Sequence, residues 1–94
     1  MSTTEYQGYA IAHGMLPHAG RPAKGSSMRT LIALAKHMRC GQAVLLSYSD
    51  MNTFRTILAA QGYSCVSDAY QSSVTGKTWV FKLKNNYENF AQAP

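Results

Sequence analysis

The clearest pattern in the chain is an alternation of apolar and other residues from Thr78 to Lys84. Side chains alternate across a β-strand with a period of two, so the alternation predicts a strand with two unlike faces. We expect the face with Lys82 and Lys84 to be solvent-exposed and basic. The core-facing positions of this strand are expected to be Trp79, Phe81 and Leu83.

Helical spacing of apolar residues predicts two helices. The first has Ser26 or Ser27 as its N-cap and ends before Gly41;. The second runs from Asp50 to Gln61, with Ser49 or Asp50 as its cap and Gly62 after its end;. The expected buried positions are Met28, Leu31, Ile32, Ala35 and Met38 in the first helix and Met51, Phe54, Ile57 and Leu58 in the second.

Three further segments have the character of strands. The apolar run from Ala43 to Leu46 opens a strand–helix–strand–strand module, whose third part is a strand from Tyr63 to Ser73;. Residues 6–16 indicate an edge strand weakened by glycines. We therefore predict an α+β fold, with a small, mainly antiparallel sheet of three or four strands and two helices on one face. Because an exposed edge strand can pair with another chain, a homodimer stays open.

Length and composition place this chain among small globular proteins. Its 94 residues suffice for a single domain, and it is 46% hydrophobic and 14% charged;. Residues 1–5 and 85–94 are expected to be flexible ends. The chain has no apolar run of about 20 residues and does not begin like a signal peptide, so we expect a cytoplasmic protein without a membrane partner.

The distribution of charge is one-sided. The formal net charge is +5, and no acidic residue stands between Glu5 and Asp50. This block is either chance in a chain with four acids or a surface for an anionic partner: nucleic acid, DNA before RNA, or an acidic protein surface. The candidate nucleic-acid-binding residues are Arg21, Lys24, Arg29, Lys36, Arg55, Lys77, Lys82 and Lys84.

A short element from Gly20 to Lys24 reads Gly-Arg-Pro-Ala-Lys. Arg21 between glycine and proline is held extended, which suits a narrow A·T minor groove. The element resembles half of an AT-hook, but Ala19 stands where the first arginine of that motif belongs. An ordinary turn before a helix is the alternative interpretation.

Motifs for catalysis or metal binding are incomplete. Gly76-Lys77-Thr78 matches the end of a P-loop, but Gln71 replaces the first glycine and a strand follows where a helix is needed;. His37 and Cys40 are one helical turn apart, and two ligands do not make a zinc site; we expect a surface imidazole and a buried thiol. Cys65 is also expected to be reduced. We predict no enzyme activity, no cofactor and no metal.

The order of these parts resembles that of small, mostly uncharacterised proteins encoded by bacteriophages. The Gly-Arg-Pro-x-Lys element precedes a segment that ends at Gly41, then the strand–helix–strand–strand module with Arg55 in its helix and a final Gly-x-x-Trp-Val-x-x-Leu strand from Gly76. The resemblance implies a small cytoplasmic protein made during infection. Two functions are open: a non-catalytic protein that contacts nucleic-acid phosphates, or an inhibitor or accessory factor that binds a host protein through its basic face.

Overall fold

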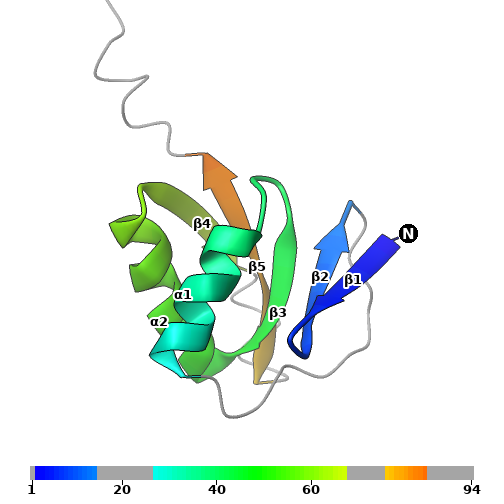
Figure 1. Ribbon diagram of the computed structural model, residues 1–94, viewed down its shortest axis with the longest axis horizontal. Helices are drawn as coiled ribbons and strands as arrows, with labels where there is room; N and C mark the ends of the chain where they lie inside the picture. The colour runs from blue at the N-terminus through cyan, green and yellow to red at the C-terminus, as the bar shows by residue number, and fades with distance from the viewer. Residues whose placement is uncertain (1, 15–26, 68–75, 85–94) are drawn as a thin grey trace, which may run out of the picture.

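The structure, a computed structural model, describes residues 2–14, 27–67 and 76–84. The elements in chain order are β1 (Ser2–Tyr6), β2 (Tyr9–His13), α1 (Met28–His37), β3 (Ala43–Ser47), α2 (Tyr48–Ala60), β4 (Tyr63–Ser67) and β5 (Lys77–Lys84). Both helices lie over one face of a five-stranded sheet (Figure 1) whose strand order is β1-β2-β3-β5-β4. Each neighbouring pair is antiparallel. The α+β prediction is confirmed, with five strands in place of three or four.

The N-terminal residues form a hairpin, which corrects two expectations. Residues 2–5 were predicted to be a flexible end, but they belong to β1, which pairs with β2 along its whole length. Gln7 and Gly8 both have positive φ, at 50° and 88°, as the tight turn of a two-residue hairpin requires;. The predicted edge strand over residues 6–16 is β2, and it lies inside the sheet because β1 covers its outer side.

Helix α1 begins at the predicted serine. The Ser27 hydroxyl accepts a hydrogen bond from the backbone N–H of Thr30 at 3.2 Å, which satisfies one of the free donors of the first turn;. The helix buries Leu31, Leu34 and Ala35. The predicted stripe was too wide, because Met28 and Ile32 remain 58% and 36% exposed.

Helix α2 follows β3 without a connecting loop. Ser47, the last residue of β3, is its N-cap, and its hydroxyl accepts a hydrogen bond from the backbone N–H of Asp50 at 3.3 Å. The prediction of Ser49 or Asp50 as the cap was wrong, because the helix begins two residues earlier than expected. Gly62, at φ 87°, lies after the end of the helix as predicted;. The buried positions match the predicted stripe: Met51, Phe54, Ile57 and Leu58.

The facing of β5 is the reverse of the prediction. Thr78, Val80 and Lys82 are buried, and the alternate positions with Trp79 and Phe81 are only partly buried. On this second face Leu45 of β3 lies opposite Trp79 and Ala43 lies opposite Phe81, and both β3 residues are also buried. Apolar side chains therefore occupy both faces of the sheet, and alternation alone did not say which face the helices cover.

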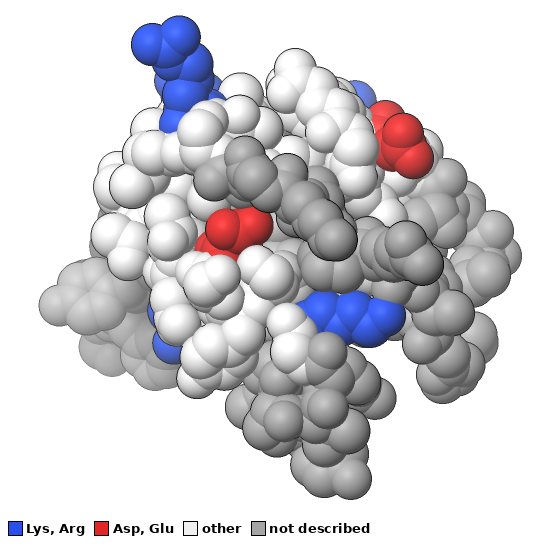
Figure 2. Space-filling view, turned by 90° about the horizontal axis from the view of Figure 1, so that it is seen from below, with Lys and Arg blue, Asp and Glu red and all other residues white. Residues whose placement is uncertain are grey.

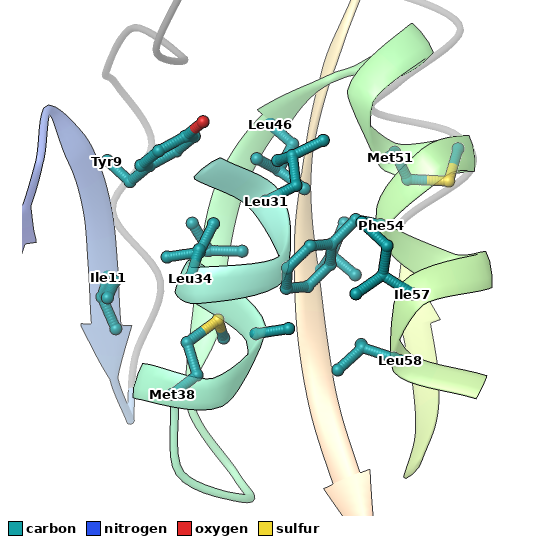
Figure 3. Close-up of a cluster of buried hydrophobic side chains, with 13 residues drawn as sticks. Tyr9, Ile11, Leu31, Leu34, Met38, Leu46, Met51, Phe54, Ile57 and Leu58 are labelled. Atoms are coloured by element: carbon teal, nitrogen blue, oxygen red, sulfur yellow. The ribbon is translucent and has the colours of Figure 1, made fainter. Parts of the chain in front are cut away.

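The core lies between the two helices and the sheet. Figure 3 shows side chains of α1 and α2 pointing toward one another, with Tyr9 and Ile11 of β2 closing one side. Phe54 is fully buried in this cluster. The remaining core side chains of the helices and of Met38, the C-cap of α1, are Leu31, Leu34, Ala35, Met38, Met51, Ile57 and Leu58.

Candidate functional site

The outer face of α1 carries exposed cations. Arg29 and Lys36 are seven residues apart, which places them on one stripe of the helix two turns from each other, and both are exposed;. The helix contains no acidic residue. Neither cation forms an ion pair with any residue in the described ranges. The stripe is therefore positive, and no acid in residues 2–14, 27–67 and 76–84 neutralises it.

Arg39 adds a third exposed cation just past the end of the helix. Its side chain is exposed, and its backbone N–H donates to the Gln42 side-chain oxygen at 2.9 Å, which fixes the turn before β3. The turn is tied to the end of β5, because the N–H of Gly41 donates to the carbonyl of Lys82 at 2.7 Å. Exposed Lys84, the last residue of β5, therefore lies at the same end of the sheet. We call Arg29, Lys36 and Arg39 the basic ridge.

Lys82 is a buried cation that serves the fold. It is 4% exposed, and its Nζ donates to the carbonyls of Ala35 at 2.6 Å and Met38 at 2.8 Å. The same atom lies 4.1 Å from the ring centroid of Tyr63;. Carbonyls at a helix C-terminus are free acceptors and carry the negative end of the helix dipole. Lys82 thus caps α1 from β5, and the prediction that it lies on a wet face was wrong.

Burial lowers the pKa of the Lys82 ammonium below its usual value of 10.5, and the charge of Cys40 opposes this by raising it. Desolvation disfavours the charged form, so the first effect is expected of an ammonium away from water. The Nζ group remains a donor in either form, so both carbonyl hydrogen bonds are compatible with a change of protonation.

The other predicted cations are spread out. Arg55 is exposed on α2, where its Nη2 lies 3.3 Å from the Met51 sulfur and 3.4 Å from the Ser67 hydroxyl. Lys77 is partly buried at the start of β5. The face in Figure 2, seen from below, shows separate basic side chains with acidic ones between them. Arg55 on α2 and Lys77 on β5 belong to other elements than the basic ridge.

Two predicted residues, Arg21 and Lys24, lie outside the described residues, as does the tail 85–94. The half AT-hook therefore stays a prediction. Both belong to the segment that directly precedes the Ser27 cap, so in sequence they continue the basic ridge toward the N-terminus.

His37 and Cys40 have different environments. His37 stacks on Tyr6 of β1, with ring centroids 4.0 Å apart and an interplanar angle of 14°. Cys40 is exposed, so the expectation of a buried thiol was wrong, and Cys65 is partly buried. Both cysteines are free thiols.

Residues that could hold a metal ion do not gather in the part of the chain that the structure describes, where no three His, Cys, Asp or Glu side chains come together. Neither α1 nor α2 has the length and apolar character that a membrane-spanning helix needs.

Sequence reasoning missed two features of this surface. It left Arg39 out of the candidate residues, although the run of cations in the sequence includes it. It also had no sign that Lys82 would turn inward, because that depends on where α1 ends. Comparisons of the chain with protein-family models, curated proteins and solved structures found no match.

Proposed function

We propose that this protein is a small, non-catalytic nucleic-acid-binding protein that contacts duplex DNA through phosphates along the basic ridge. One observation carries the proposal: three exposed cations follow α1 from its first turn to the turn after it, without acidic partners among the residues that the structure describes. Such a surface repels itself unless an anion lies against it. Phosphate contacts position a protein on DNA without requiring a base-reading motif.

The geometry also limits the number of contacts. From Arg29 to Lys36 the helix rises about 10 Å. Three phosphate contacts give a slope of about −2.7 for log K against log salt. A steeper slope is expected if Arg21 and Lys24 contribute, since each added contact changes it by about −0.9.

The test is a titration of labelled duplex DNA at several salt concentrations between about 50 and about 200 mM. We expect Lys36→Met to make the slope shallower by about 0.9 and to weaken binding equally on unrelated sequences. The matched control is Lys82→Met, which lowers the net charge by the same amount but removes a buried ammonium.

The control separates the contribution of the basic ridge to DNA binding from the effect of the net charge of the protein. Lys82→Met, shown to be folded by circular dichroism, is expected to leave the slope unchanged. Equal loss in both variants would mean that net charge alone attracts DNA and would overturn the assignment to the ridge. Absence of duplex binding at physiological salt would end the nucleic-acid proposal.

A further inference from the structure

A groove of ≈ 380 Å³ runs between α1 and α2. Met28 and Ile32 line it from α1, and Ile57 and Ala60 line it from α2. Met28 and Ile32 are one helical turn apart, so their side chains form a continuous apolar stripe. The volume of the groove lies in the range of about 300–1,000 Å³ that is usual for binding pockets.

The groove exposes side chains that the fold leaves uncovered. Met28 is 58% exposed and Ile32 is 36% exposed, whereas Ile57 is 6% exposed and forms the floor. The side-chain nitrogen of Gln61 lies 3.5 Å from the carbonyl oxygen of Ile32, a contact that joins the two helices at this groove. Amphipathic helices bind hydrophobic grooves of this kind, in which apolar side chains of two packed helices are exposed. Methionine adapts to different partner shapes, which favours the same use.

Charge around the groove is positive. Lys36 lines it and lies one turn beyond Ile32, and Arg29 follows Met28 on the exposed side of α1. None of the described residues that line the groove is acidic. A basic partner is therefore repelled, and an acidic partner gains attraction on the side of the groove that α1 forms.

We propose that this groove binds an amphipathic helical segment of another protein, with an apolar stripe for Met28, Ile32 and Ile57 and with carboxylates for Lys36 and Arg29. Helix-in-groove recognition uses anchors at spacing i, i+3 or i+4, and i+7. The ten residues of α1 are about 15 Å long, so they match about three turns of a partner helix. This interaction does not depend on nucleic-acid binding, although Lys36 takes part in both.

The probe is a synthetic peptide of about 15 residues, long enough to form a marginal helix, with leucines at the anchor spacing and glutamates on both flanks. The first control peptide has the same leucines at positions out of the anchor register. The second keeps the anchor register but has lysines in place of the glutamates. Binding is followed by fluorescence anisotropy and by mapping amide NMR shifts. We expect the patterned acidic peptide to bind about tenfold or more tightly than either control, with shifts in α1 and α2.

Two matched variants test the apolar stripe. Met28→Glu and Val66→Glu add the same charge at residues that are 58% and 55% exposed, the second on edge strand β4 away from the groove. Glutamate in the first turn of α1 is compatible with folding. We expect Met28→Glu to weaken peptide binding by about tenfold or more and Val66→Glu to leave it unchanged. Equal loss in both would contradict the inference.

A charge reversal tests the partner's sign. Lys36→Glu is expected to weaken binding of the acidic peptide and to strengthen binding of the lysine peptide. The control is Arg55→Glu, because the Arg55 guanidinium lies next to Ser67. It is expected to change the binding of neither peptide. Three outcomes overturn the proposal. The first is equal binding of all peptides, and the second is a dimer that Met28→Glu dissociates, because it assigns the groove to a second copy. The third is amide NMR shifts at the groove with DNA but none with peptide. Since no DNA is present in the peptide assay, its failure leaves the nucleic-acid proposal standing.

Discussion

The two faces of β5 bury different kinds of side chain. On the side that α1 and α2 cover lie Thr78, Val80 and Lys82, all nearly inaccessible to water. On the other side the large residues Trp79 and Phe81 are only partly buried. The smaller and more polar set therefore lies in the more completely enclosed space. Residue hydrophobicity alone does not decide which side of a strand is covered.

The difference follows from what each side offers its residues. Under the helices, the bulk of the core comes from α2 and α1, with Phe54 fully buried, so β5 contributes side chains of modest size. Lys82 is stable there because the C-terminal carbonyls of α1 accept its hydrogen bonds;. A charge is buried at acceptable cost when it is fully hydrogen-bonded. The covered side is thus apolar with one satisfied ammonium.

The largest effect that tests this comparison is expected from two phenylalanines. Phe54→Ala should lower the free energy of unfolding by about 3–5 kcal/mol, because it leaves a cavity in the closed core. Phe81→Ala should cost roughly half of that or less, since part of its ring already contacts water. Urea denaturation of both variants measures the difference. Equal losses would mean that both sides of β5 are closed to the same degree.

An intermediate effect is expected from the two lysines at the end of β5. Lys82→Met keeps most of the side-chain volume but leaves the Ala35 and Met38 carbonyls without their donor, and should cost about 1–3 kcal/mol;. Lys84→Met, at an exposed position, should change stability by about 0.5 kcal/mol or less;. Hydrogen exchange should also be faster in the last turn of α1 in the first variant only. The reverse order of costs would contradict the capping role.

The smallest effect concerns pH. Because the pKa of Lys82 is lowered in the folded state, the unfolded chain binds more protons between that lowered value and 10.5. Stability contributed by Lys82 should therefore rise with pH across this interval and be constant below it. The measurement is the difference in unfolding free energy between the protein and its Lys82→Met variant as a function of pH. Both proteins carry Cys40→Ser, so that the opposing charge of Cys40 is absent. A difference that falls with rising pH would show a raised pKa instead.

The candidate surface was only partly predictable. Arg29 and Lys36 follow from helical spacing, because residues seven apart share a face and the apolar stripe defines the other one. Lys82 does not, because the direction of its side chain depends on the position of the α1 C-terminus, where Met38 is 44 residues from Lys82 in sequence. Nor does the groove at Met28 and Ile32, since periodicity placed both in the core and the position of α2 left them exposed.

The sequence by itself determined the class of fold, a serine cap for α1 at residue 26 or 27, the buried positions of α2 and the one-sided charge of α1. These depend on neighbours within one turn or one strand, and local spacing encodes them. Tertiary structure alone decided that residues 2–5 pair as β1, that Ser47 both ends β3 and caps α2, and which face of β5 is covered. The covered face of β5 depends on helices that are distant in the chain, and Ser47 belongs to two elements at once. β1 depends on its neighbour β2, to which the turn at Gln7 and Gly8 joins it.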